Sequence, residues 1–375
     1  MSGIYIHIPF CRKACHYCNF HFSISQQSRT AMVAAIAREA VIRKDFIPHQ
    51  VSTIYFGGGT PSLLSADELM LIIETITSHF SLVPGAEITL EANPDDISSN
   101  KLQEWKKTGI NRLSIGIQSF FEEDLQWMNR AHNAQQAKDC ILLAQQAGFH
   151  NLTIDLIYGT PGLSNEKWIS NIETAIALKI PHLSCYALTV EPNTSLDKLI
   201  QKGNKADVDQ QGQAIHFDLL VARLEAIGFE HYEISNFALP GFRSRHNSSY
   251  WQGKPYLGLG PSAHSFSGSI RQWNISNNAL YLKSMEQGLV SFEAEQLTDD
   301  QQLNEYIMTS LRTMEGCSLK LIEEKWGKKN AAAVKNAAQK YLKEETVYLS
   351  GNHLTLTKKG KFLADGIAAE LFQLS

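Results

Sequence analysis

Excess basic charge, long apolar runs and cysteine are all scarce in this sequence of 375 residues. The formal net charge is −4, which leaves no overall basic footprint, so we expect no nucleic-acid partner. No uninterrupted apolar stretch approaches the roughly 20 residues that span a bilayer. Residues 1–10 lack the basic and apolar regions of a signal peptide. We therefore expect a cytoplasmic protein, and its 43% hydrophobic residues suit a globular fold with a sizeable core.

The few cysteines are unevenly placed. Of six in all, Cys11, Cys15 and Cys18 fall within eight positions. In a reducing compartment, grouped cysteines bind metal more often than they form disulfides. The other three stand alone, and we predict that they are buried apolar side chains: Cys140, Cys185 and Cys317.

Short β-rich runs alternate with amphipathic helical patterns over residues 1–235. The predicted strands are Ile4–Ile8, Thr53–Phe56, Glu87–Glu91, Leu113–Ile117, Leu152–Ile157, Leu183–Ala187 and Glu230–Ile234. The helical segments between them are 31–44, 66–79, 134–147, 166–178 and 210–227. This βα repeat predicts an α/β fold with a parallel sheet, curled into a full or partial (β/α) barrel. An open doubly wound sheet is the alternative.

Two further parts follow this core domain. Residues 236–296 form an extension in which Gly, Pro, Ser and aromatic residues interrupt the periodic pattern. Residues 297–375 predict a small α+β domain with helices near 300–312, 318–326 and 330–343, a hairpin across Tyr348–Thr357 and a last helix at 360–373. Helices followed by a hairpin are typical of a winged helix. We favour packing of this domain against the barrel or a partner over DNA binding, because its helices show no clear basic face.

The grouped cysteines have the spacing Cys11-x3-Cys15-x2-Cys18, directly after the first predicted strand. That position puts three thiolates on one loop at the C-terminal mouth of a parallel sheet, where such folds build their sites. Three ligands leave one iron of a 4Fe–4S cluster open for a further ligand. A zinc site is the alternative, with His16 or His21 as the fourth ligand that zinc prefers.

Six motifs in register resemble the radical S-adenosylmethionine (SAM) superfamily, in particular the branch with oxygen-independent coproporphyrinogen III oxidase and the heme chaperone HemW. They are Tyr5-Ile-His-Ile-Pro-Phe-Cys11, Gly57-Gly-Gly-Thr-Pro61, Leu90-Glu-Ala-Asn-Pro94, Gly116-Ile-Gln-Ser-Phe120, Asn129-Arg-Ala-His132 and Asp155-Leu-Ile-Tyr-Gly159. The likeness runs along nearly the whole chain. It implies a partial barrel that holds one 4Fe–4S cluster, whose open iron binds SAM and whose electron cleaves it to an adenosyl radical.

The resemblance also implies a set of SAM-binding residues. The backbone at Gly58 and Gly59 would approach the methionyl group closely, which the absence of a side chain permits. The Arg130 fork suits the SAM carboxylate. Glu91 and Asp155 would accept hydrogen bonds from the ribose hydroxyls or the amino group of SAM. The full set is Tyr5, Tyr17, Gly58, Gly59, Thr60, Glu91, Gln118, Arg130, Asp155 and Ala187.

Two departures separate this sequence from the oxidase pattern. The oxidase carries a fourth cysteine two residues after the third, where this chain has Phe20, and it has more residues before the cluster. In addition, His246-Asn-Ser-Ser-Tyr250-Trp251 matches the HNxxYW signature of the heme chaperone.

A heme would suit that signature, since imidazole is an axial ligand and aromatic rings stack on a porphyrin. The candidate heme residues are His246, Asn247, Tyr250, Trp251 and His264. The alternative is that His246 is a hydrogen-bonded histidine between two domains, with Trp251 in their interface.

From the resemblance we therefore expect a heme chaperone that binds a cluster, SAM and heme and delivers heme to apo-hemoproteins, including respiratory ones. The alternatives are an oxygen-independent coproporphyrinogen III oxidase and a radical SAM enzyme acting on another substrate. The resemblance further implies flavodoxin or ferredoxin as electron donor. A homodimer and peripheral contact with a membrane are compatible with it, although no helix requires either.

Overall fold

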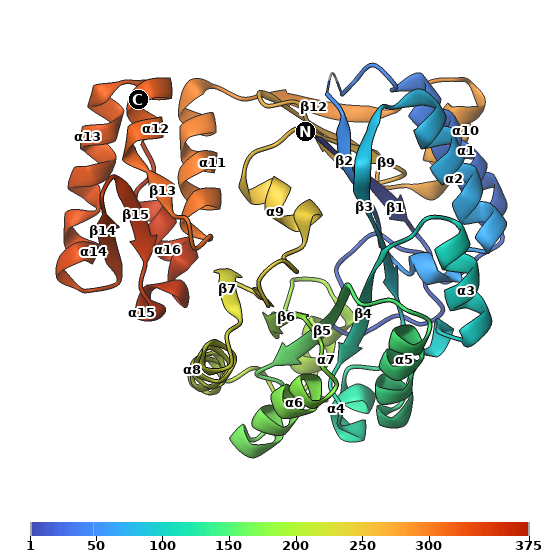
Figure 1. Cartoon of the computed structure of the whole chain (residues 1–375), viewed down its shortest axis with the longest axis horizontal. Helices are drawn as coiled ribbons and strands as arrows, with labels where there is room; N and C mark the ends of the chain where they lie inside the picture. Colours follow the sequence, from blue (N-terminus) through green and yellow to red (C-terminus); the bar gives the residue numbers. More distant parts are fainter. Residues whose placement is uncertain (1, 48, 374–375) are drawn as a thin grey trace.

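The computed structural model describes residues 2–47 and 49–373, and these form a mixed α/β fold with one large and one small sheet (Figure 1). Six parallel strands neighbour one another in sequence order in the large sheet: β1 (Ser2–Ile8), β2 (Val51–Gly58), β3 (Leu82–Ala92), β4 (Arg112–Gln118), β5 (Leu152–Tyr158) and β6 (His182–Ala187). Across these six strands the order never reverses, which excludes the doubly wound alternative, because such a sheet has a switch point among its parallel strands. The edges of the sheet among the described residues are β12 and β7, so the barrel is partial and open.

Helical segments follow these strands, and the longer of them cover the outer face of the sheet (Figure 1). They are α1 (Arg29–Ile42), η1 (Pro61–Leu63), α2 (Ala66–His79), η2 (Pro94–Asp96), α3 (Ser99–Lys107), α4 (Glu122–Trp127), α5 (Ala134–Gln146), α6 (Asn165–Ala177), α7 (Ser195–Gln201) and α8 (Gln210–Ala226). Ser65 caps α2 through a capping box with Glu68, as the sequence pattern predicts.

The period-two alternation of the strands divides their side chains between two environments. One set joins the apolar core beneath the helices, for example Ile4, Ile6 and Ile8 of β1. The alternate set faces the concave side and is largely polar: Tyr5, His7, Thr53, Tyr55, Glu87, Glu91, Arg112, Ser114, Thr153, Asp155, His182 and Ser184. The concave side of the sheet is therefore a buried polar interior that can hold a ligand.

One predicted strand does not continue the parallel repeat. The segment Glu230–Ile234 contains β7 (Glu230–Glu233), which pairs antiparallel with β8 (Asn236–Ala238), and β8 in turn pairs antiparallel with β6. The predicted strand is therefore present but antiparallel, and the parallel repeat ends at β6. Too few residues separate β7 from β8 for a crossover helix, so the two form a hairpin.

The extension adds strands to the opposite side of the sheet. Its elements are α9 (Arg245–Trp251), β9 (Tyr256–Leu259), β10 (His264–Phe266), β11 (Ile270–Asn274), α10 (Asn278–Glu286) and β12 (Phe292–Gln296). Strand β9 pairs parallel with β1, although no periodic pattern announces it. The carboxylate of Glu39 in α1 ties the two parts together: it accepts hydrogen bonds from Tyr281 (2.7 Å), Asn274 (2.7 Å) and the Gly260 amide (2.8 Å).

The C-terminal unit has its own buried apolar cluster. It contains α11 (Asp299–Leu311), β13 (Cys317–Ser318), α12 (Leu319–Trp326), α13 (Lys328–Ala337), α14 (Gln339–Lys343), β14 (Val347–Ser350), β15 (His353–Leu356), α15 (Lys358–Lys361) and α16 (Ala364–Glu370). Its three strands form the small antiparallel sheet in the order β13-β15-β14. The arrangement agrees with the winged-helix-like prediction, while the predicted boundaries after residues 235 and 296 stay predictions.

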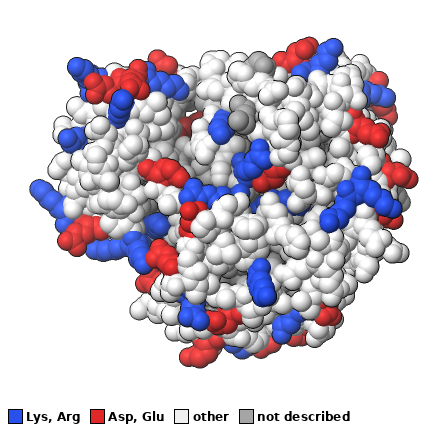
Figure 2. Space-filling model, viewed as in Figure 1, with Lys and Arg blue, Asp and Glu red and all other residues white. Residues whose placement is uncertain are grey.

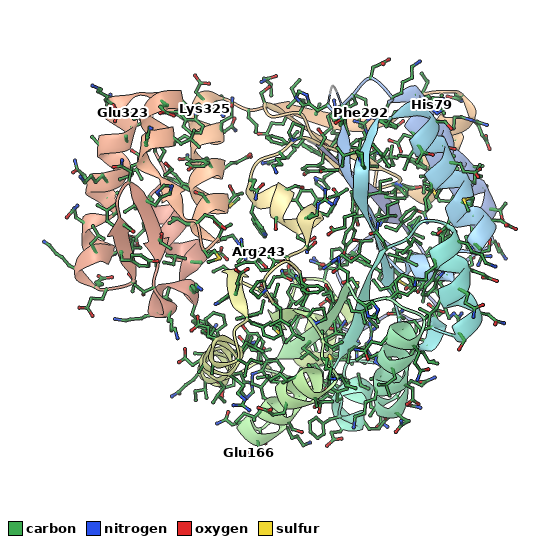
Figure 3. All side chains as sticks on the ribbon, viewed as in Figure 1. His79, Glu166, Arg243, Phe292, Glu323 and Lys325 are labelled. Atoms are coloured by element: carbon green, nitrogen blue, oxygen red, sulfur yellow. The ribbon has the colours of Figure 1, made fainter. Side chains whose placement is uncertain are left out.

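Charged side chains of both signs line the seam between this unit and the large sheet (Figure 2). Arg243, labelled in Figure 3, bridges the two: its Nε donates to Glu230 (2.8 Å) and its Nη1 to Glu315 (2.8 Å). No described helix is long and apolar enough to span a membrane.

Candidate functional site

The cysteine loop leaves β1 at the C-terminal end of the sheet and is held by its neighbours. The Cys11 amide donates to the Ser23 carbonyl (3.0 Å), and the Thr60 amide donates to the Phe10 carbonyl (2.7 Å). The Thr60 hydroxyl donates to Cys11 Sγ at 3.5 Å. Three half-buried thiols, those of Cys11, Cys15 and Cys18, thus lie on one loop as predicted, whereas Cys140, Cys185 and Cys317 are buried.

A short segment after α4 clamps the same loop. Asn129 adopts a left-handed conformation (φ 61°), and its side-chain amide donates to the Ala14 carbonyl at 2.8 Å. The next residue, Arg130, donates from Nη1 to Cys15 Sγ at 3.2 Å. Asparagine is one of the residues that tolerate this conformation, which explains the Asn-Arg pair in the motif. Loop and clamp together set the thiols before any cluster binds.

The zinc alternative finds little support in the geometry. His16 Nδ1 is hydrogen-bonded to the Trp127 carbonyl (3.1 Å), and His21 Nε2 to the side chain of Asn278 (2.8 Å). Over residues 2–47 and 49–373, no three His, Cys, Asp or Glu side chains converge as the ligands of one metal ion.

Burial makes two of the three thiols harder to ionise. Burial raises the pKa of Cys11 to about 11, against a hydrogen bond from Thr60 that lowers it, and burial also raises the pKa of Cys18. Metal ligation requires the thiolate, so cluster insertion releases protons here.

The glycine run at the end of β2 allows a close approach of backbone segments. A Cβ on Gly59 would stand 2.6 Å from the Phe10 carbonyl oxygen and 2.8 Å from that of Ile8. Gly58 has φ +103°, and a Cβ there would stand 2.6 Å from the His7 ring. Neither position accepts a side chain, so the run presents bare backbone beside the cysteine loop.

A cavity of about 440 Å³ opens between this backbone and the concave face of the sheet. Its volume lies in the range of roughly 300–1,000 Å³ common for small-molecule sites. The three cysteines line it together with nine of the ten predicted SAM residues: Tyr17, Gly58, Gly59, Thr60, Glu91, Gln118, Arg130, Asp155 and Ala187. The tenth, Tyr5, lies outside it, lining a second cavity and stacking on Tyr55 with the ring centroids 6.2 Å apart.

Arg130 is half-buried, and its terminal nitrogens are engaged. Besides Cys15, it donates from Nη2 to the side chain of Asn93 and to the Gly116 carbonyl, both at 2.8 Å. Burial acts to lower its pKa, but the nearby Tyr17 and Cys15 raise it overall. Its Nε is buried with no partner in the described part of the chain. An unsatisfied buried donor beside the thiols fits an anionic ligand group such as a carboxylate.

Gln118 ends β4 at an irregularity in the β4–β5 register. Its φ is +68°, a conformation that costs a non-glycine residue about 1–3 kcal/mol. Such strain gathers at ligand sites, which agrees with the predicted role of Gln118.

Two half-buried acids face the cavity from β3 and β5. Burial raises the pKa of Glu91 to about 8, and the neighbouring Asp155 adds to the rise, while a hydrogen bond from the Tyr55 hydroxyl (2.7 Å) opposes it. Burial likewise raises the pKa of Asp155 to about 6, against a hydrogen bond from Ser184. Carboxyl groups with raised pKa values in a cavity are candidates for binding a cation.

We expect the affinity for SAM to rise with pH from about 6 to about 8. Protonated acids of raised pKa lose their attraction for a sulfonium, so SAM binding expels protons and weakens as pH falls. Each group contributes up to about tenfold per pH unit below its pKa. Calorimetric titration of the cluster-loaded protein would measure this. Glu91→Gln should flatten the upper part of the profile, whereas the exposed Glu104→Gln should not; identical profiles for wild type and Glu91→Gln would contradict the assignment.

The predicted set omits three residues that complete the site. Asn93 joins Arg130 to the Thr60 hydroxyl (3.3 Å), Asn129 clamps the cysteine loop and Tyr55 binds Glu91. Asn93 and Asn129 both lie within motifs quoted from the sequence. Tyr55 lies two residues before the glycine run, and its side chain points to the same concave face of the sheet as that of Tyr5. Their positions in the motifs, and the alternation of side chains along β2, are the sequence signals from which these residues could have been predicted.

The candidate heme residues divide into two groups. Tyr250, Trp251 and His264 line the second cavity, whereas His246 and Asn247 do not. His246 is buried at the other end of the strands from the cysteine loop. Its Nδ1 is hydrogen-bonded to Thr53 (2.7 Å) and its Nε2 to the Tyr250 hydroxyl (2.8 Å). This geometry favours the alternative of a hydrogen-bonded histidine, and heme ligation by His246 stays a prediction.

Known proteins resemble the chain along its whole length. The family model of the radical SAM superfamily matches residues 5–192, and that of the HemN C-terminal domain matches residues 297–363. The heme chaperone HemW of Bacillus subtilis is 33% identical over 98% of both chains, and that of Mycobacterium tuberculosis H37Rv is 33% identical over 98% of this chain and 94% of its own. Among solved structures, coproporphyrinogen III oxidase (HemN) from Escherichia coli superposes with a TM-score of 0.85 at 25% identity, covering 99% of this chain and 90% of that one.

Proposed function

Since the chain belongs to the radical SAM superfamily and, within it, to the HemW family, we propose that it is a heme chaperone that binds heme and delivers it to apo-hemoproteins. The 4Fe–4S cluster and SAM follow from the family, and the first cavity has the residues to hold both. Heme, in this proposal, is the cargo.

Each group at the first cavity has a role in holding the two cofactors. Cys11, Cys15 and Cys18 would ligate three irons, and the glycine run would hold the methionyl end of SAM. The Arg130 guanidinium would meet the carboxylate of SAM, and Glu91 and Asp155 would offset its positive charge. When bound, the cluster supplies the electron that cleaves the SAM sulfonium. Burial on the concave face would exclude water from that reaction.

The side chain of Phe20 is the observation that favours a chaperone over an oxidase. The oxidase pattern has a cysteine where this chain has Phe20, and the Phe20 side chain is 65% exposed at the mouth of both cavities. A phenyl ring cannot replace a thiol in ligating or redox chemistry. Sequence identity of 33% to two HemW chaperones supports the same choice.

The second candidate is an oxygen-independent coproporphyrinogen III oxidase. The match of residues 297–363 to the HemN C-terminal domain and the close superposition on HemN favour it. Because HemW and the oxidase share this fold, the fold alone does not separate them. A radical SAM enzyme with another substrate is the third candidate.

An anaerobic assay of the cluster-loaded protein with SAM, a reductant and coproporphyrinogen III tests the proposal. We expect no protoporphyrinogen and no CO2, with hemin binding by the same preparation and transfer of that hemin to an apo-hemoprotein. Reduced flavodoxin or ferredoxin would serve as the physiological electron donor. Formation of protoporphyrinogen would make the chain an oxidase, and absence of both hemin binding and turnover would point to the third candidate.

A further inference from the structure

The second cavity, of about 870 Å³, is larger than the first. Three segments line it: the start of the chain around β1 and the cysteine loop, the extension from Tyr250 to Arg271, and helices α11 and α12 of the C-terminal unit. Figure 1 shows α9 between the C-terminal unit and the large sheet. Asn19 and Phe20 line both cavities, so the two adjoin beside the cysteine loop.

One wall is a flat, aromatic face of the strands β9–β11. Phe266 pairs with Tyr256 and with Arg271 across the ladders, and His264 pairs with Trp273. Residues directly opposite in a ladder share a face, and so do residues two apart in a strand, so all five side chains lie on one side. Ring centroids lie 6.3 Å apart both for Tyr256 with Phe266 and for His264 with Trp273.

The opposing wall comes from the C-terminal unit and is aromatic. Its charged side chains are Lys325 and Glu305, and Glu305 is ion-paired with Arg271 of the first wall. Tyr306 and Trp326 have ring centroids 5.6 Å apart, and Lys325 Nζ lies 4.4 Å from the Trp326 ring centroid. Lys325 has no carboxylate partner among the described residues. Met308 and Leu321 add exposed apolar surface. Two aromatic walls and an uncompensated ammonium suit a large flat ligand that carries carboxylates.

His264 differs from the other histidines near this cavity. His7 is hydrogen-bonded at both ring nitrogens, to the Tyr5 hydroxyl (3.2 Å) and the His21 carbonyl (2.8 Å), and His21 is bonded to Asn278. His264 is exposed to the cavity and has no hydrogen bond in the part of the chain that the structure describes. Burial and the nearby Arg271 lower its pKa, so its imidazole is neutral at physiological pH. A neutral imidazole with free nitrogens can ligate iron.

We propose that heme lies in this second cavity, stacked on the β9–β11 face with a carboxylate beside Lys325, and that His264 rather than His246 is its axial ligand. This inference rests on the proposed heme-chaperone function. It also gives Tyr250 and Trp251 a place at the cavity, with His246 as the buried residue that positions Tyr250.

Titration of the full-length chain with hemin, followed by Soret absorbance, tests the ligand. His264→Ala should shift the Soret band and weaken binding by about tenfold or more, and added imidazole should restore the band. His79→Ala, an exposed histidine on the far side of the molecule from Lys325, is the matched control and should behave as wild type (Figure 3). His246→Ala should leave the Soret position unchanged. An unshifted band in His264→Ala, or a shift in His246→Ala that imidazole reverses, would overturn the ligand assignment.

Metal-free protoporphyrin IX tests the cavity independently of the iron. Its binding should quench tryptophan fluorescence, and Lys325→Glu should weaken it by about tenfold. Lys329→Glu, an exposed neighbour on α13 outside the cavity, is the control for the change in net charge. Equal affinities for the two variants would overturn the cavity assignment. Wild-type protein that binds neither hemin nor protoporphyrin would instead refute the proposed function itself, and the inference with it.

Discussion

Replacing Cys15 with serine should leave the reconstituted protein without its broad visible absorption and with iron and sulfide near background. Cys15 is the middle ligand of the loop, and its sulfur also accepts the hydrogen bond from Arg130. A serine hydroxyl is a harder and far more weakly acidic ligand, which suits iron–sulfur chemistry poorly. Two remaining thiolates do not hold a four-iron cluster. Iron and sulfide analysis with absorption spectroscopy after anaerobic reconstitution would measure the loss.

The matched control is Cys140→Ala. Unlike the half-buried Cys15, Cys140 is buried, and it lies in α5, where its thiol donates to the Ala137 carbonyl (3.4 Å). This variant should keep a full cluster at a small cost in stability. Unchanged iron and sulfide in Cys15→Ser would remove Cys15 from the ligand set, and an equal loss in Cys140→Ala would indicate a general folding defect.

Adding one methyl group at Gly59 should weaken SAM binding at least about tenfold and lower the free energy of unfolding by about 1–3 kcal/mol. The new Cβ would meet the backbone oxygens of Phe10 and Ile8 at 2.6 and 2.8 Å, and backbone cannot rotate away as a side chain can. The cysteine loop would have to move from the glycine run. The backbone hydrogen bonds that join them, including Gly59 to Ile8 (2.9 Å), would lengthen.

SAM affinity by calorimetry and unfolding in urea would check this result. Gly366→Ala is the control, because a Cβ there, in α16, meets no atom within 4 Å outside the backbone of its own helix and its chain neighbours. That variant should bind SAM as wild type does and gain up to about 1 kcal/mol of stability, since alanine favours a helix over glycine. Wild-type SAM affinity in Gly59→Ala would show that the loop and glycine run need not approach so closely.

Local sequence patterns were enough to predict the core of the fold. Alternation and turn residues predict β1 to β6 within a few positions of their ends, and the βα repeat predicts their parallel order. Beyond Ala226 the same rules predict β7 but not its antiparallel pairing, and they miss the short strands β8 to β12. Strand β9 has only four residues, and one of them is a glycine, Gly258, so no alternation of apolar and polar residues marks it in the sequence. Its pairing with β1 stabilises it instead. Such tertiary pairing has no local signal.

In the candidate site, too, the sequence predicts what local motifs encode but not the contacts between distant residues. Motifs on strand ends predict the cavity that gathers the cysteines with Glu91, Arg130 and Asp155. They do not reveal that Arg130 is held by Asn93 and Gly116, or that His246 is bonded to Thr53, because these partners lie far apart in the sequence. A residue type at a motif position indicates which chemistry is available, whereas hydrogen bonding decides whether its atoms are free for a ligand.

The pairing of β1 with β9 has a consequence for how the chain is made. A ribosome produces β1 first, but its second neighbour, Tyr256–Leu259, is synthesised only after all six parallel strands. Until then one edge of β1 offers unpaired amides and carbonyls, and such edges pair readily with other chains. The carboxylate of Glu39 likewise lacks its hydrogen-bond donors Gly260, Asn274 and Tyr281 until the extension has been synthesised. Nascent or truncated chains that lack the extension should therefore aggregate, and completion of the sheet should be a late, slow event during folding.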